Sequence, residues 1–199
     1  MVHALVPAAR YTMTVAPQRG AVDAPEPQKE EATGTVRLAG VGDVDVCAMI
    51  VPVYWDLAAI LAIKEIDAFA PDLVVMNGIA GPAQDLWIEL GAVNRAMPLE
   101  DGSNQLVPRV PAGQEFAPLV PSASRAEAAL GLRLSWSAVR EAARQAIAQR
   151  GAVTEGGVSL GDVLTGALLG GFPRGSNTYL CNNIAYVVNY AMAHPSRTL

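Results

Sequence analysis

The pattern of apolar and polar positions changes near residue 34. Before it, prolines recur at positions 7, 17, 25 and 27, and the run from Asp23 to Glu31 is charged and turn-prone. This pattern predicts an irregular N-terminal segment over residues 1–33, with at most one short strand near Tyr11–Val15. We expect residues 34–199 to form one domain, which suits a chain of 199 residues.

Residues 44 to 76 predict a strand, a helix and a second strand. Val44–Val53 is a continuous apolar run rich in β-branched residues, which is typical of a strand covered on both faces. Leu57–Phe69 has a helical pattern, and Ala70-Pro71 should end it, because proline pushes the preceding residue out of the α region. Leu73–Met76 then predicts a second buried strand. A strand, a helix and a strand with short connections form a βαβ unit with parallel pairing.

The later part of the chain predicts one more strand and two more helices. Leu86–Val93 favours a strand, and a helix that Ser135 or Ser137 can cap should run to Arg150. No element is assigned to the glycine-rich stretch 156–171. A final helix is expected over Cys181–His194, with a buried side made of Ile184, Val187, Val188, Ala191 and Met192.

Composition and charge exclude several classes of function. The chain is 51% hydrophobic, but no stretch reaches the roughly 18 apolar residues of a membrane span. The apolar excess therefore indicates buried sheets and helices or the interface of a homo-oligomer. The net charge is -5 and the basic residues are scattered, which argues against nucleic acid as a partner. Two cysteines without metal-ligand spacing predict a reduced, cytoplasmic protein and no metal site.

Cys181 is the strongest candidate for chemistry. It stands in the stretch Gly175–Asn183, where an apolar helix begins. Unpaired backbone N–H groups and the positive end of the helix dipole favour the thiolate, which is the nucleophilic form of cysteine. The same N–H groups can hold an oxyanion. Position alone nevertheless favours the alternative, a small apolar residue at a helix start. Cys47 lies in the middle of an apolar strand and is predicted to be core.

The stretch Thr178–Asn182, followed by an apolar helix with an aromatic at Tyr186, resembles the nucleophile motif of the pyroglutamyl peptidase I (pyrrolidone-carboxylate peptidase) family. In that family Ser-Ala-Gly leads into an aromatic, an aliphatic, Cys and Asn. Ser176-Asn177 stands here in place of Ala-Gly, beside the oxyanion region. The resemblance implies that Cys181 is the catalytic nucleophile and that Asn182 contributes to substrate binding.

A second stretch resembles the same family. Gly78-Ile79-Ala80-Gly81, followed by Glu89, Ala92 and Asn94, is similar to its Gly-Leu-Ala-Gly loop and active-site Glu-x-x-Ala-x-Asn. Pro82-Ala83 and Trp87 depart from the family's Gly-Arg and its Ser or Thr. The resemblance implies that Glu89 is the active-site glutamate. It also implies that the substrate pocket is shaped by Gly78, Ile79, Ala80 and Gly81. Without this match, Glu89 would be interpreted as an exposed carboxylate on a strand.

The resemblance fails at two places. In the family, a histidine on a late strand activates the thiol, whereas His194 is the only histidine after Cys181. At about 1.5 Å rise per residue, His194 lies several turns away, so we predict a helix-end histidine without catalytic function. The family's opening Gly-Phe-x-Pro-Phe, whose aromatics help enclose the pyroglutamyl ring, has no match in Met1–Gly34.

The resemblance covers roughly residues 36–105 and 171–195, and indicates a divergent or truncated member. It implies a three-layer α/β/α domain with a mostly parallel central sheet, of the phosphorylase/hydrolase-like kind. It also implies a cysteine peptidase that removes the N-terminal pyroglutamyl residue from peptide substrates, with no metal or organic cofactor. Two alternatives stay open: an inactive homologue that serves as a binding protein, and an incomplete subunit whose catalytic histidine is supplied elsewhere.

Overall fold

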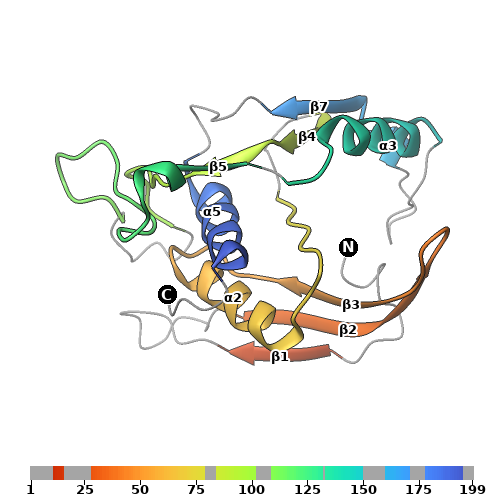
Figure 1. The fold of residues 1–199 in the computed structure, drawn as a ribbon, viewed down its shortest axis with the longest axis horizontal. Coiled ribbons are helices and arrows are strands. Elements are labelled where there is room, and N and C mark those ends of the chain that lie inside the picture. Colours follow the sequence, from red (N-terminus) through yellow and green to blue (C-terminus); the bar gives the residue numbers. More distant parts are fainter. Residues whose placement is uncertain are drawn as a thin grey trace. The chain divides into compact units, whose positions relative to one another are not determined.

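The protein is a mixed α/β structure with small sheets (Figure 1). The chain divides into two compact units, Met1–Pro71 with Glu100–Val107 and Asp72–Leu99 with Pro108–Leu199. In the part of the chain described here, no helix has the length and apolarity to cross a membrane. The residues that this computed structural model describes are 11–15, 28–78, 84–101, 109–131, 133–149, 160–170 and 178–194.

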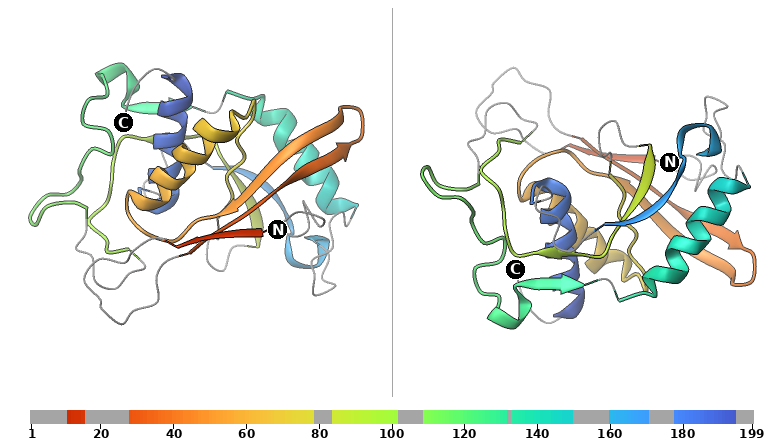
Figure 2. Two further views of the ribbon diagram at one scale, coloured as in Figure 1. Left: turned by 90° about the horizontal axis from the view of Figure 1, so that it is seen from below. Right: turned by 90° about the horizontal axis from the view of Figure 1, so that it is seen from above.

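The first unit contains an antiparallel sheet of order β1-β2-β3. β1 (Tyr11–Val15) pairs with the first residues of β2 (Gln28–Leu38), and β2 pairs along most of its length with β3 (Gly42–Ile50). The distal half of the β2–β3 hairpin therefore extends past β1 as a two-stranded ribbon (Figure 2). β1 confirms the predicted short strand, whereas β2 begins inside the segment predicted to be irregular. The division at residue 33 itself stays a prediction.

The predicted helix is confirmed, but the βαβ unit around it is wrong. α2 (Leu57–Phe69) has the predicted bounds, and Ala70 ends it in the left-handed conformation, at φ 51 and ψ 56. β3 ends before Pro52 and pairs antiparallel with β2, and its burial alternates along the strand. Leu73–Met76 forms no strand, and Leu73 and Val75 are 58% and 71% exposed. The pattern indicates β propensity but does not determine which partner a strand finds.

The second unit contains the parallel pairing. β4 (Asp85–Glu89) runs parallel to β7 (Gly166–Gly170), and β5 (Gly91–Val93) runs antiparallel to β6 (Ala129–Gly131). Only Leu90 separates β4 from β5, so the predicted strand Leu86–Val93 is present as two pieces. Within the described ranges, β4–β7 is the only parallel sheet, so these residues do not form the predicted mostly parallel central sheet.

Helices complete the second unit. α3 (Trp136–Ala148) packs on β7 and β4, and α5 (Leu180–Ala193) packs on β5 and β6. The short α4 (Leu160–Val163) and β7 lie in the glycine-rich stretch to which no element was assigned. The 3-10 turn η1 (Arg125–Glu127) precedes β6. Buried apolar side chains of this unit include Ala92, Val93, Ala96, Leu119, Val120, Ile147, Ala167, Leu180, Tyr186, Val188 and Tyr190.

The predicted buried side of α5 is correct only in part. Val188 is buried as expected, but Met192 is 37% exposed. The helix instead buries polar and aromatic side chains, namely Asn182, Asn183, Tyr186 and Tyr190. An amide or a phenol can be buried when a hydrogen bond replaces its contact with water. Asn182 and Tyr186 have such partners outside the helix, which the pattern of one helix does not reveal.

Candidate functional site

Cys181 is the second residue of α5, and its side chain is exposed. Tyr179 is the N-cap, and the first helical hydrogen bond runs from Asn183 N to Tyr179 O, at 2.9 Å. The N–H groups of Leu180, Cys181 and Asn182 precede that bond, so they have no acceptor within the helix. Together with the helix dipole, these N–H groups favour negative charge beside the thiol.

Gly78 lies against this thiol. A Cβ atom placed on Gly78 would be 3.3 Å from the Cys181 Sγ atom. The structure therefore brings together two residues that the sequence assigns to separate motifs. The other predicted loop residues, Ile79, Ala80 and Gly81, lie outside the described residues.

We expect Gly78→Ala to slow the alkylation of Cys181 by iodoacetamide several-fold. The new methyl group, at 3.3 Å, must displace the sulfur by a few tenths of an ångström. Gly131→Ala is the matched control, since a Cβ there meets its nearest atom, Leu90 O, at an ordinary 3.8 Å. Labelling rates measured by mass spectrometry compare the variants. Equal rates for Gly78→Ala and wild type would show that the thiol is not held against this glycine.

Glu89 is the last residue of β4, partly buried and opposite Gly170 of β7. Val93 follows four residues later, so the two Cα atoms are at most about 13 Å apart at about 3.3 Å per strand residue. Val93 is hydrogen-bonded to the side chain of Asn182, the residue after the nucleophile candidate. Glu89 therefore lies on the strand segment that is attached to the first turn of α5.

The side chain of Asn182, for which the resemblance implies substrate binding, is bonded to backbone atoms. Its side chain is 4% exposed, and its Oδ1 accepts the Val93 N–H at 2.9 Å. Its Nδ2 donates to Val93 O at 2.9 Å and to Arg95 O at 2.8 Å. Both donors of the carboxamide are used, which leaves none for a substrate. Asn182 therefore binds the backbone at the end of β5 and just beyond it, and its part in substrate binding stays a prediction.

The other residues of the Glu-x-x-Ala-x-Asn stretch are structural. Ala92 is buried at 2% exposure. Asn94 Oδ1 accepts the N–H groups of Leu119 and Val120, at 2.7 and 2.8 Å, and its Nδ2 donates to Val120 O at 2.9 Å. Asn94 therefore attaches the segment around residues 119–120 to the end of β5.

His194 caps the C-terminus of α5, as predicted. Its Nε2 is hydrogen-bonded to Glu127 Oε1, and its ring centroid lies 4.6 Å from that of Tyr190. At a rise of about 1.5 Å per residue, the thirteen residues from Cys181 correspond to about 20 Å. The imidazole therefore does not reach the thiol.

The carboxylate of Glu127 takes part in several hydrogen bonds, and the resemblance to the family gives no indication of them. Ser124 Oγ and Ser124 N donate to Glu127 Oε2 at 2.7 and 2.8 Å, and the bond from Ser124 N belongs to the capping box at the start of η1. These two bonds, and then the one from His194, lower the pKa of Glu127 from 4.5 to about 2. The Ser-x-x-Glu spacing is the sequence signal that could have revealed the bonds from Ser124.

Tyr186 connects α5 to the same turn. Its hydroxyl donates to Glu127 O at 2.7 Å, and the ring is fully buried. Burial, and then the nearby Glu127 carboxylate, raise the pKa of Tyr186 from 10.0 to about 12. The middle of α5 is therefore held by a polar contact with η1.

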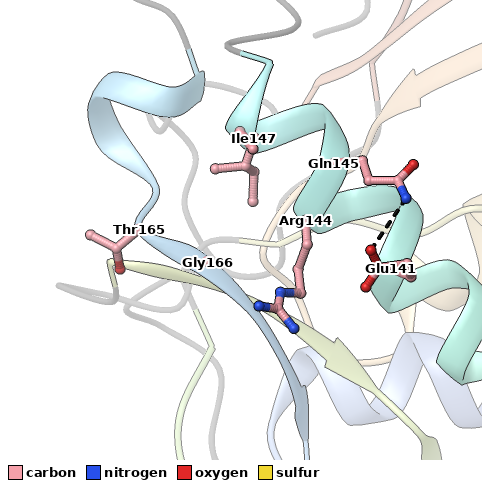
Figure 3. A pocket seen from close by; sticks show the side chains of 7 residues that line it. Glu141, Arg144, Gln145, Ile147, Thr165 and Gly166 are labelled. Atoms are coloured by element: carbon pink, nitrogen blue, oxygen red, sulfur yellow. Dashed lines mark hydrogen bonds between the residues drawn. The ribbon is translucent and has the colours of Figure 1, made fainter.

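An open cavity of about 400 Å³ lies between α3 and the start of β7 (Figure 3). On the α3 side of it, Glu141 accepts a hydrogen bond from Gln145, one turn along the same helix, at 3.2 Å. Gly166 of this cavity pairs with Asp85, at the opposite end of the parallel pair from Glu89. Neither Gly78, Glu89 nor Cys181 lines this cavity. Its lining residues are Glu141, Arg144, Gln145, Ile147, Ala148, Thr165 and Gly166.

The fold and the site together define a mixed α/β protein with an exposed thiol at a helix start. Among the residues described, no three His, Cys, Asp or Glu side chains gather as metal ligands would. No protein-family model matches the chain, and no curated protein or solved structure matches it significantly. A more specific function therefore rests on the residues around Cys181.

Proposed function

We propose that the chain is a cysteine omega-peptidase of the pyroglutamyl peptidase I type, which removes N-terminal pyroglutamyl residues from peptides. The observation that carries this proposal is the contact of Gly78 with the Cys181 thiol, 3.3 Å from the Cβ position of the glycine to Sγ. The stretch that begins at Gly78 and the stretch around Cys181 each resemble that family. The contact between Gly78 and Cys181 supports the interpretation that both belong to one site. Packing does not require this cysteine, because Cys181 is exposed.

The proposal includes the family's three-layer α/β/α fold and a cytoplasmic setting. The parallel pairing of β4 with β7 supports the fold, because parallel strands need a crossover connection. Both cysteines are free thiols, which suits a reducing compartment.

The reaction proceeds by nucleophilic catalysis. The thiolate of Cys181 attacks the carbonyl carbon of the pyroglutamyl residue, and the N–H groups at the start of α5 bind the oxyanion. The bond between carbon and the peptide nitrogen then breaks, leaving a thioester on Cys181. Water hydrolyses this thioester and regenerates the thiol. Glu89 lines the site and orients the pyroglutamyl group.

The leaving amine needs a proton. His194 is hydrogen-bonded to Glu127 and lies about 20 Å along the helix from Cys181. In this proposal the proton that the thiol loses on ionisation is passed to the amine by water. The number of protons is therefore balanced over the reaction. The distant imidazole is also the observation that favours the alternative functions, an inactive homologue that binds a partner or a subunit that obtains its histidine from another chain.

The test is the release of a fluorogenic amine from a pyroglutamyl amide under reducing conditions. We expect activity in the wild type, loss of activity in Cys181→Ala, and retention in Cys47→Ala. Cys47 is the matched control, a free thiol on β3 whose Sγ lies 3.7 Å from Glu65 Oε1. Cys47 is predicted to be a core residue, but its side chain is only half-buried.

Two results would contradict the proposal. One is activity that survives Cys181→Ala. The other is a folded wild type that neither releases the amine nor reacts with iodoacetamide at Cys181 at neutral pH. The second result would favour the inactive homologue. Activity that appears only after another polypeptide is added would favour the incomplete subunit.

A further inference from the structure

The first turn of α5 is bonded to β5 through a side chain that acts like a neighbouring strand. The Asn182 carboxamide both accepts from Val93 N and donates to Val93 O, each at 2.9 Å. A strand paired with β5 would make the same pair of bonds to one residue. The third bond, from Asn182 Nδ2 to Arg95 O at 2.8 Å, extends the contact past the end of β5.

The segment on the other side of this contact consists of β4, which ends at Glu89, and β5, which ends at Val93. β7 pairs with β4 and β6 pairs with β5. The backbone adds one more link, since Met97 N donates to Thr178 O at 2.9 Å, ahead of the helix start. Asn182 is therefore the side chain that links the first turn of α5, which carries the thiol, to the segment that follows Glu89.

We propose that Asn182 is a positioning residue, which fixes the Cys181 thiol relative to Glu89 and does not contact the substrate. This inference rests on the proposed function. Displacing a reacting group by about 1 Å can cost about 100-fold in rate. Loss of the three bonds should therefore lower kcat and leave KM nearly unchanged, because the substrate contacts stay in place.

The neighbouring Asn183 provides a matched control. It is the same residue type on the same helical turn and is 1% exposed, but within the part of the chain that the structure describes neither its Oδ1 nor its Nδ2 has a hydrogen-bond partner. Asn182→Ala and Asn183→Ala remove the same atoms from buried positions. The difference between the two variants therefore isolates the effect of the three hydrogen bonds.

The experiment measures kcat and KM for a pyroglutamyl amide, and the rate of iodoacetamide alkylation of Cys181 across pH. We expect Asn182→Ala to lower kcat by about 100-fold, and to shift the pH at which alkylation is half-maximal. Asn183→Ala should match the wild type in both. Circular dichroism confirms that each variant is folded. If Asn182→Ala does not fold, Asn182→Gln keeps the carboxamide but adds one methylene, and the same fall in kcat is expected.

Two outcomes would overturn the inference. A raised KM with unchanged kcat in Asn182→Ala or Asn182→Gln would show that Asn182 contacts substrate. Equal kcat and equal alkylation profiles for Asn182→Ala and Asn183→Ala would show that the bonds contribute only to packing. If the wild type has no peptidase activity, the alkylation profiles still decide about Asn182. Failure of the proposed function is thus distinguished from failure of the positioning role.

Discussion

Replacing Tyr186 with alanine is expected to lower the free energy of unfolding by about 3–5 kcal/mol, the range found for aromatic side chains truncated in protein cores. The ring is fully buried, and its centroid lies 6.2 Å from that of Tyr190. Domains are stable by only about 5–15 kcal/mol in total, so this loss is a large fraction. Guanidinium unfolding followed by circular dichroism measures it. No fall in stability would show that this ring is not part of the core.

Tyr186→Phe is the control that separates the ring from the hydroxyl. It removes the bond to Glu127 O and should cost about 1 kcal/mol. The unfolded phenol ionises near 10.0 and the folded one near a pKa of about 12. The stability that this group contributes is therefore complete below pH 10 and is lost as pH rises toward 12. The phenylalanine variant should lack that loss, and equal stability of the alanine and phenylalanine variants would contradict the account.

Elements whose limits come from local chemistry are predictable from the sequence. The bounds of α2, Leu57–Phe69, coincide with the prediction because an apolar helical pattern and the Ala70-Pro71 stop are both local. Strand pairing is not local. The sequence predicts the strand β3 correctly, but it does not predict that β3 pairs antiparallel with β2. Leu73–Met76 has the composition of a strand and yet forms none. Apolar character does not specify which edge a strand joins.

The candidate site also has features that the sequence predicts and features that it does not. The order of motifs predicts that Gly78 and Cys181 belong to one site, and the structure has them in contact. The hydrogen bonds of Asn182 could not be predicted, because its partners are backbone atoms far away in the sequence, of Val93 on β5 and of Arg95 just beyond it. Motif resemblance transfers a residue type but not its hydrogen bonds. An asparagine beside a nucleophile therefore looks like a substrate contact until its carboxamide is placed.

The carboxyl of Glu127 should make the protein sensitive to acid. Its pKa in the folded protein is about 2 and its ordinary value is 4.5, chiefly because Ser124 Oγ and N donate to it. Between these values the unfolded chain binds the proton more readily than the folded one. The contribution of Glu127 to the free energy of unfolding should therefore be fully present above pH 4.5. It should fall as the pH drops from 4.5 toward 2.

Glu127→Gln tests this account, because an amide cannot titrate. The variant should be less stable than wild type at pH 6, and its free energy of unfolding should depend less on pH between 4.5 and 2. Glu141→Gln is the control. Glu141 is an exposed glutamate on α3, hydrogen-bonded to Gln145, and this variant should keep the wild-type dependence. Urea unfolding at a series of pH values measures all three proteins. If Glu127→Gln keeps the full acid dependence, other carboxyls cause it, and the contact of Ser124 and His194 with Glu127 contributes little to stability.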